Sequence, residues 1–313
     1  MTLAAQAQTQ AACTFNFFSP TTPFKLHNGN PVYINPLGIN DFGTVVGYSV
    51  PGTSHRGLIR WANGGVTRVK GTSGLFARND HGTSVGEDLI PQAILVNGTT
   101  ITPIVLDVNN VDFIEVKGIN RWGTIVGEYF TPDSAHGYKL WKNGTTHILD
   151  FPGAPPNSTQ PAGINDVGTV VGTYSDKNLL LHGFIFHNGQ WATLDYPHVS
   201  NTELVGITNA GKIFGLTFEN AITTAFLYEN GTFKVISLPN SVPGILILRS
   251  VSPKQGLILG VTDINFGKPA CELGSLFSNP CKPLGDPLQH SRSAIAEDQD
   301  RTCYEDATFI GVS

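Results

Sequence analysis

The stretch Ile164-Asn165-Asp166-Val167-Gly168-Thr169-Val170-Val171-Gly172 decides the architecture, because its pattern occurs six times along the chain. The paired glycines of the six copies begin at Gly43, Gly82, Gly123, Gly168, Gly211 and Gly256. The copies follow one another about every 43 residues, a spacing typical of propeller blades and solenoid units. Asn and Asp favour tight turns, and the glycine after them adopts a positive φ without strain. Each copy therefore predicts a hairpin of two strands joined by a polar turn.

A second hairpin follows in each repeat. Residues 182–186 are rich in aromatic and β-branched side chains, as strands are, and Asn188-Gly189 is a strong hairpin-turn signal. A fourth strand is expected over residues 193–197, which read Thr-Leu-Asp-Tyr-Pro. Four strands per repeat predict an all-β fold, a six-bladed β-propeller of four-stranded blades. A linear β-solenoid is the alternative.

The sixth copy lacks an evident fourth strand after residues 257–263 and the strand-like residues 274–279. Residues 14–20, near the start of the chain, have the length, the aromatic side chains and the terminal proline of such a strand. We expect this N-terminal strand to close the ring, because closure removes an exposed sheet edge. A solenoid would not need a unit that is split in this way.

The ends of the chain differ from the repeat. Residues 1–12 contain Ala5-Gln6-Ala7, which resembles the small-residue end of an export signal, so they are expected to be a signal remnant or a disordered tail. Residues 13–283 are expected to form the propeller of six repeats. Residues 284–313 are polar and are expected to form a C-terminal tail packed on it.

The four cysteines occur only near the termini, at Cys13, Cys271, Cys281 and Cys303. An even number in this arrangement favours two disulfides in an oxidising compartment, and four cysteines allow three pairings. We favour Cys271–Cys281 as a local loop and Cys13–Cys303 as a link between the ends. Their spacing does not fit a zinc site. The sequence thus predicts a secreted protein, in the bacterial periplasm or outside the cell.

Composition excludes several classes of partner. Only 14% of residues are charged, the net charge is −5, and the 19 lysines and arginines do not cluster, so a nucleic-acid partner is not expected. The longest purely aliphatic run is residues 245–248, far shorter than the ~20 residues of a membrane helix. We expect a monomer with no membrane span and no cofactor.

The repeat resembles the HAF-type extracellular repeat of bacteria. The resemblance rests on the Gly-Ile-Asn-Asp-x-Gly-x-Val-Val-Gly pattern, the third-strand start His182-Gly183-Phe184 and its counterpart His136-Gly137-Tyr138, the Asn-Gly turns, and Leu-Asp-Tyr-Pro. It covers roughly residues 14–265, and copies two and six depart from it most. It implies an exported propeller and provides no catalytic residues to carry over.

The propeller topology places the variable loops on one face, where binding residues concentrate. The mouth of the central channel on that face is expected to carry the polar residues that do not repeat. These are Glu87, Asp88, Glu128, Tyr129 and Tyr174 after second strands, and Lys117, Glu203 and Arg249 before or within first strands. Lys117, Glu203, Arg249 and Asp88 are the candidate binding residues, and Glu87, Glu128, Tyr129 and Tyr174 are weak catalytic candidates.

No metal site is expected. His55, His136 and His182 occupy equivalent positions in different blades, too far apart to share a zinc ion, so a structural role is predicted. The repeated turn residues Asp41, Asp80 and Asp166 do not supply the 6–8 oxygen ligands that calcium takes.

The sequence contains no Gly-x-Ser-x-Gly elbow, His-Glu-x-x-His pair or phosphate loop. We therefore expect a binding or scaffold module for a glycan or another cell-surface ligand. The alternative is a carbohydrate-active hydrolase or lyase in which Glu87 and Glu128, at equivalent positions of adjacent blades, act as acid and base. A purely structural role is a third possibility, and the sequence leaves open whether the protein is an enzyme.

Overall fold

The computed structural model describes residues 9–10, 16–18, 21–25, 31–50, 55–219, 222–237, 245–263 and 309–311. Within these ranges every helix or strand assigned is a strand, and no helix there is long and apolar enough to cross a membrane. The four cysteines, residues 1–8 and the expected strand at 274–279 all lie outside the described residues. The disulfide pairing therefore stays a prediction.

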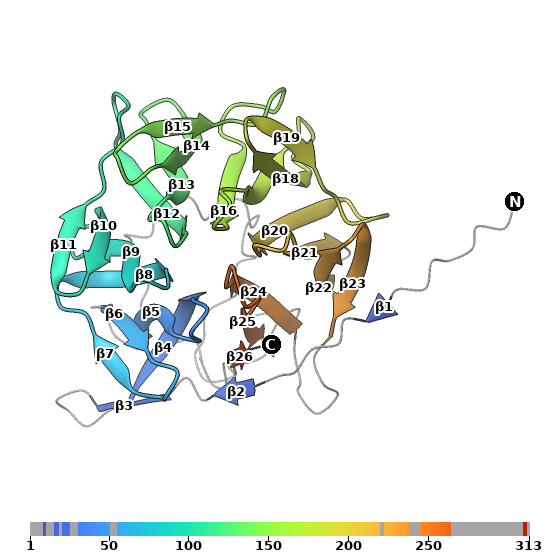
Figure 1. Cartoon of the computed structure of the whole chain (residues 1–313). Helices are drawn as coiled ribbons and strands as arrows, with labels where there is room; N and C mark the ends of the chain where they lie inside the picture. The colour runs from blue at the N-terminus through green and yellow to red at the C-terminus, as the bar shows by residue number, and fades with distance from the viewer. Residues whose placement is uncertain are drawn as a thin grey trace, which may run out of the picture.

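The strands form a β-propeller, with six sheets standing around a common axis (Figure 1). Five of them are blades of four consecutive antiparallel strands, and the first strand of each blade lies innermost. From the axis outward the five blades are β4 (Pro31–Ile39), β5 (Val45–Val50), β6 (Gly57–Arg60) and β7 (Val66–Arg68); β8 (Thr72–Arg78), β9 (Thr83–Asp88), β10 (Ala93–Asn97) and β11 (Thr100–Pro103); β12 (Phe113–Ile119), β13 (Ile125–Phe130), β14 (Ala135–Leu140) and β15 (Thr146–Leu149); β16 (Thr159–Ile164), β17 (Val170–Ser175), β18 (Leu181–His187) and β19 (Gln190–Thr193); β20 (Asn201–Ile207), β21 (Ile213–Glu219), β22 (Ile222–Glu229) and β23 (Thr232–Ile236).

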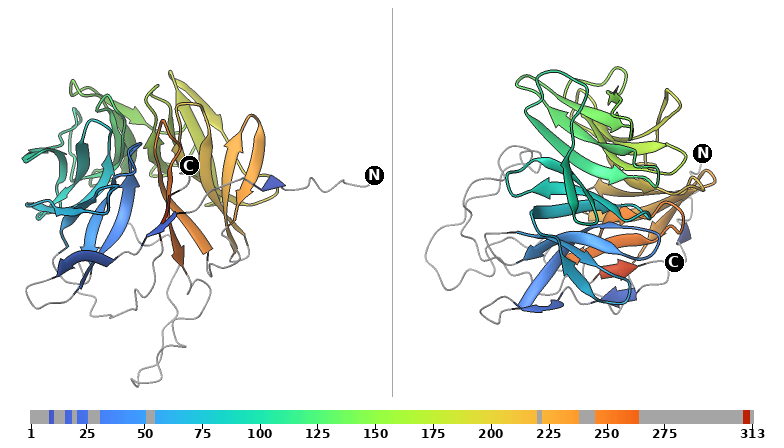
Figure 2. Two further views of the ribbon diagram at one scale, coloured as in Figure 1. Left: turned by 60° about the horizontal axis from the view of Figure 1, so that its bottom comes forward. Right: turned by 60° about the vertical axis from the view of Figure 1, so that its left-hand side comes forward.

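The sixth sheet is built differently, so the prediction of six equivalent blades is wrong. Its order is β24 (Ile245–Val251), β25 (Ile258–Asp263), β26 (Phe309–Gly311) and β2 (Asn16–Phe18). Only β24 and β25 come from the repeat, because the described part of the sixth copy contains a single hairpin. The place beside β25 is taken by β26, from the C-terminal end, and β2 pairs with β26 (Figure 2).

Two further short strands widen neighbouring sheets. β1 (Thr9–Gln10) pairs in parallel with β23, and β3 (Thr21–Lys25) pairs antiparallel with β4. The N-terminal segment therefore contributes strands to three sheets rather than to one.

The second glycine of each repeat motif permits a bulge in the innermost strand. Gly127 on β13 lies opposite Val116, and the pairing resumes at Gly118, so Lys117 is left unpaired. A side chain at Gly127 would overlap the carbonyl oxygen of Glu115 and would lie 3.1 Å from the Cα atom of Val116. Only glycine allows the two backbones to approach this closely. All six innermost strands show this interruption opposite the equivalent glycine.

The turn asparagines join neighbouring blades. The Asn79 amide donates to the carbonyl oxygen of Asn120 at 3.0 Å, Asn120 donates to Asn165 at 3.1 Å, and Asn165 donates to Thr208 at 2.9 Å. These side chains are buried, so each bond satisfies groups that water cannot reach. The Asn of the repeat therefore has a second role beyond shaping its own turn.

The apolar core lies between adjacent sheets. One cluster combines Val171 of β17 with Leu204 and Phe226 of the next blade. Another places Leu259 of β25, which is completely buried, against Ile34 and Leu58 of the first blade. The sixth sheet therefore packs against the first blade as the other neighbours pack against each other.

Candidate functional site

The bulges of the innermost strands supply one residue each to a common central cavity. The six unpaired residues are Leu37, Phe76, Lys117, Ala162, Val205 and Arg249. All six line a cavity of about 460 Å³, which we call the central cavity. A bulge leaves its extra residue out of the ladder and changes the direction of its side chain. The repeat thus delivers two cations and four apolar side chains to the axis.

Polar residues at the outer ends of the strands complete the central cavity. Four glutamates line it, together with Gln160 and Thr173, and these glutamates are Glu87, Glu115, Glu128 and Glu203. They lie where first strands begin and second strands end, which is the face that carries the variable loops. The cavity therefore combines carboxylate, amide, hydroxyl and cationic groups with an apolar wall.

The structure brings together five of the eight residues predicted at this mouth. Glu87, Lys117, Glu128, Glu203 and Arg249 all line the central cavity. The other three, Asp88, Tyr129 and Tyr174, are not among its lining residues.

Alternation along the second strands explains why those three residues lie elsewhere. Neighbouring side chains on a strand point to opposite faces, so Tyr129 cannot share the direction of Glu128. The Tyr129 ring instead stacks on His136, with ring centroids 5.1 Å apart, and Tyr174 stacks on His182 at the same distance. Asp88 shapes its own loop by accepting hydrogen bonds from the amides of Ile90 and Gln92.

Sequence reasoning missed Glu115, Gln160 and Thr173. Glu115, Gln160 and Glu203 each stand two residues before the bulge residue of their strand. Aligning the repeats on the Gly-Ile-Asn or Gly-Ile-Thr sequence would have placed Glu115 and Gln160 beside Glu203. Thr173 stands directly after the second glycine of its repeat, as Glu128 does in the preceding one.

Lys117 is the centre of charge in the cavity. Its Nζ atom lies 2.6 Å from Oε2 of Glu115 and 3.9 Å from Oε2 of Glu128. Burial opposes the charge of Lys117, but Glu115, Glu128 and Glu87 together raise the pKa of its ammonium group. The lysine therefore stays charged among the carboxylates.

Burial raises the pKa of three of the glutamates. The pKa of Glu128, whose side chain is 9% exposed, rises to about 7 because burial and then the charge of Glu115 outweigh the opposing effect of Lys117. Burial also raises the pKa of Glu87, with a contribution from Glu115, and that of Glu203, against the effect of Arg249. Near neutral pH, Glu128 can therefore hold or release a proton.

Thr173 presents a hydroxyl group without a protein partner. Its side chain is 5% exposed, and its Oγ1 atom makes no hydrogen bond to the described residues. A buried hydroxyl that is not hydrogen-bonded costs free energy, and a ligand in the cavity would remove that cost.

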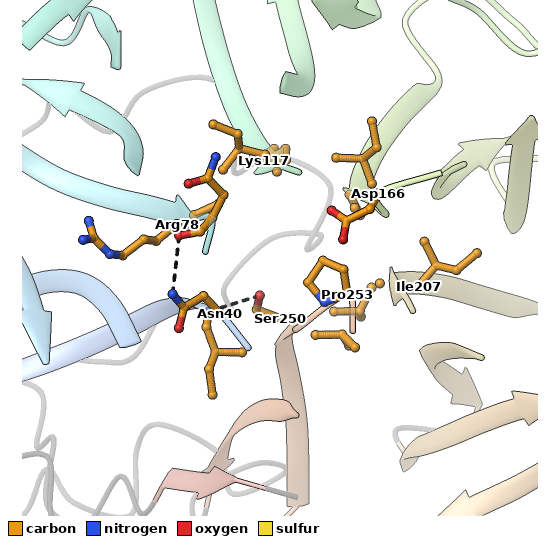
Figure 3. Close-up of a pocket in the computed structure, with 18 of the residues that line it drawn as sticks. Asn40, Arg78, Lys117, Asp166, Ile207, Ser250 and Pro253 are labelled. Carbon is orange, nitrogen blue, oxygen red and sulfur yellow. Dashed lines mark hydrogen bonds between the residues drawn. The ribbon is translucent and has the colours of Figure 1, made fainter. Parts of the chain in front are cut away.

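The opposite end of the axis is narrow. There a cavity of about 50 Å³ is lined by turn residues, including Asn40, Asp166 and Pro253 (Figure 3). Lys117 and Arg249 line both cavities, so these two cations mark the boundary between them. On the same face, burial and the neighbouring Asp41 raise the pKa of Asp80 to about 6.

The repeated histidines are held within their blades. Nδ1 of His136 lies 2.8 Å from Oδ2 of Asp150, and Nδ1 of His182 lies 2.8 Å from Oδ2 of Asp195. His55 contacts the ring of Tyr48, with centroids 4.8 Å apart. Among the described residues, no group of three or more His, Cys, Asp or Glu side chains is arranged to hold a metal ion.

Comparison with known proteins identifies the fold alone. No family model and no curated protein matches the chain. Among solved structures, TolB from Acinetobacter baumannii is similar with a TM-score of 0.50 and 13% identity, and the match covers 72% of this chain and 59% of TolB. A streptogramin B lyase matches with a TM-score of 0.46 and 13% identity, over 79% of this chain and 80% of the lyase. A lectin of Aleuria aurantia in complex with α-methyl-L-fucoside matches with a TM-score of 0.45 and 11% identity, over 72% and 86%. Enzymes and sugar-binding proteins thus both occur among the similar propellers, and the likeness does not decide between catalysis and binding.

Proposed function

We propose that this chain is a secreted β-propeller that binds a neutral glycan in its central cavity. The observation that carries the proposal is the convergence of Lys117, Glu115, Glu128 and the partnerless Thr173 on one cavity. Sugar hydroxyls both donate and accept hydrogen bonds, so carboxylates, an ammonium group and a hydroxyl can all pair with them. Apolar side chains such as Phe76 provide a wall for the C–H faces of a sugar ring.

Charge selects the class of glycan. Four glutamates against Lys117 and Arg249 leave the cavity with an excess of carboxylates, even when Glu128 is protonated. Acidic sugars would meet like charge at short range, which is unfavourable in a poorly solvated site. The ligand is therefore a neutral or amino-bearing saccharide rather than a uronic acid.

The proposal includes a closed ring. The sixth sheet, completed by β2 and β26, serves as the sixth blade, and the chain belongs with the HAF-type extracellular repeats. We place the protein outside the cytoplasm as a monomer. Mass spectrometry of non-reduced peptides tests the Cys13–Cys303 and Cys271–Cys281 links, and cell fractionation tests the location.

Isothermal titration with neutral oligosaccharides of glucose, xylose and mannose tests the binding site, with oligogalacturonate as the acidic comparison. We expect one neutral class to bind and oligogalacturonate to give no heat. Lys117→Met and Thr173→Val should each raise Kd by about tenfold, which corresponds to about 1.4 kcal/mol. Lys70→Met, at an exposed lysine outside the cavity, is the matched control and should leave Kd unchanged. No binding by any neutral sugar, or unchanged Kd in both cavity variants, would overturn the proposal.

A second candidate function rests on the pKa of Glu128. A general acid must be protonated near the working pH, and a buried carboxyl group with a pKa of about 7 meets that requirement. Glu128 would then protonate the leaving oxygen of a glycosidic bond, with an ionised glutamate such as Glu87 as its partner. Incubating the bound oligosaccharide with the protein and analysing products separates the two functions. A hydrolase or lyase releases shorter sugars, and its Glu128→Gln variant would bind without releasing them.

A further inference from the structure

A hydroxyl, an imidazole and a carboxylate are aligned in the third blade, outside the central cavity. The loop between β13 and β14 ends at Ser134, whose Oγ atom lies 2.8 Å from Nε2 of His136. On the other side of the ring, Nδ1 of His136 lies 2.8 Å from Oδ2 of Asp150. The three groups thus form a continuous hydrogen-bonded chain on the face of the variable loops.

The carboxylate determines the direction of these hydrogen bonds. A carboxylate oxygen only accepts, so Nδ1 of His136 carries the proton and donates it to Asp150. In the neutral ring Nε2 then has a free lone pair, and the hydroxyl of Ser134 donates to it. This is the arrangement in which an imidazole removes a proton from a serine as the oxygen attacks.

The surrounding residues hold the serine and the imidazole in place. Thr131 Oγ1 accepts a hydrogen bond from the amide of Ser134 at 3.0 Å, which closes the loop into a tight turn. Tyr129 stacks on the ring of His136. Asn157 accepts from the amide of Ala135 at 2.5 Å, while its Nδ2 group makes no hydrogen bond to the described residues. That amide is a donor next to the serine, where an oxyanion would develop.

The neighbouring blade provides an internal comparison. His182 and Asp195 repeat the 2.8 Å contact, and Tyr174 stacks on the ring as Tyr129 does. Its Nε2 atom, however, faces Asp176 at 3.9 Å and no hydroxyl group. The His–Asp pair is therefore a structural feature of the repeat, and Ser134 is an addition specific to the third blade.

We propose that Ser134, His136 and Asp150 hydrolyse small acyl esters such as O-acetyl groups. Ser134 Oγ forms a bond to the acyl carbon while its proton passes to Nε2 of His136, and the carbon–oxygen bond to the alcohol breaks as His136 returns the proton to the leaving oxygen. Water then attacks the acyl-serine by the same route and releases the carboxylic acid and the free serine. Asp150 is half-exposed at 51%, so water weakens its effect on the imidazole and the rates are modest.

A fluorophosphonate probe, which phosphonylates an activated serine, tests the proposal together with hydrolysis of p-nitrophenyl acetate. We expect peptide mapping to locate the label on Ser134, and Ser134→Ala to abolish both labelling and turnover. Asp150→Asn should lower both by about tenfold or more, because the imidazole loses its orientation. Asp195→Asn, which alters the equivalent pair in the next blade, should leave both unchanged.

Circular dichroism confirms that each variant is folded. Absence of labelling in the folded wild-type protein would overturn the proposal, as would a label on another serine. Equal losses in Asp150→Asn and Asp195→Asn would assign both pairs a structural role only.

Discussion

The carboxylate of Asp41 accepts a hydrogen bond from the backbone amide of Gln255 at 2.7 Å, which joins the turn of the first blade to the turn of the sixth sheet. The amide of Lys254 donates to both oxygens of the same carboxylate, at 2.9 and 3.1 Å. Asp41 itself is 8% exposed, so these bonds are shielded from water. A single side chain thus links two parts of the chain that are more than two hundred residues apart.

Asp41→Ala should destabilise the protein by about 1–3 kcal/mol. The substitution leaves the amides of Lys254 and Gln255 without acceptors at a closed junction, and bonds to charged acceptors contribute at the upper end of the usual range. Relief of the repulsion between Asp41 and Asp80 offsets part of the loss. Thermal unfolding should show a decrease in Tm of several degrees.

Asp112→Ala is the control for this measurement, because Asp112 is exposed and its side chain makes no hydrogen bond to the described residues. Its Tm should equal that of the wild type. A Tm for Asp41→Ala that matches the control would show that the ring junction does not depend on this carboxylate.

Gly127→Ala should be far more damaging than Gly144→Ala in the same blade. At Gly127 the new methyl group would overlap the carbonyl oxygen of Glu115 and force apart the backbones that form the bulge. At Gly144 the space is open, and the cost arises only from a φ of 89°. We expect about 3 kcal/mol for Gly127→Ala and about 1–2 kcal/mol for Gly144→Ala. Urea unfolding measures both, and equal losses would refute the packing argument.

These glycines show how far the sequence predicted the fold. The spacing of the motif correctly predicted hairpins, four-stranded blades and the propeller, because turns and strand length are local properties. The need for Gly127 was not predicted, because it arises from a pairing register that only the folded sheet defines. The sixth sheet was predicted poorly for a related reason: its outer strands, β26 and β2, come from distant parts of the chain.

The site was predicted to a similar extent. Glu87 and Glu128 follow the second glycine of their repeats, so their shared place at the axis could be inferred from the repeat. The same reasoning wrongly included Tyr129, because it took no account of the alternation of side chains along a strand. Lys117 was correctly included, but the bulge that directs it to the axis was not foreseen.

Thr173→Val should raise the stability of the ligand-free protein. The hydroxyl of Thr173 is buried without a partner, and replacing it by a methyl group removes an unsatisfied polar atom from the interior. A gain of about 1 kcal/mol, seen as an increase in Tm of a few degrees, is expected. Thr223→Val removes the other buried hydroxyl without a partner among the described residues and should give a similar gain.

The two variants differ in their position relative to the central cavity. Thr173 lines it and Thr223 does not, so only Thr173→Val should also weaken glycan binding. A lower Tm for Thr173→Val would mean that the hydroxyl is hydrogen-bonded in the free protein, and the argument from its lost hydrogen bond would fail.

Stability should increase as the pH falls from about 8 to about 5.5, because two carboxyl groups bind a proton more tightly in the folded chain. The pKa of Glu128 is about 7 and that of Asp80 about 6, whereas the same groups titrate near 4 when unfolded. Their contribution is fully present below about pH 4 and is lost as the pH rises through about 6 and about 7. Hydrogen bonds lower the pKa of Asp176 and Glu229, so these groups lose their contribution only at more acidic pH.

Glu128→Gln tests the assignment, because glutamine is neutral at every pH. Tm measured at intervals across this range should fall less steeply with rising pH in the variant than in the wild type, and the difference should be centred near pH 7. Lys117→Met should shift that centre upwards, since Lys117 lowers the pKa of Glu128. Identical pH profiles for the wild type and Glu128→Gln would show that Glu128 is ionised throughout, and its role as a proton donor near neutral pH would be excluded.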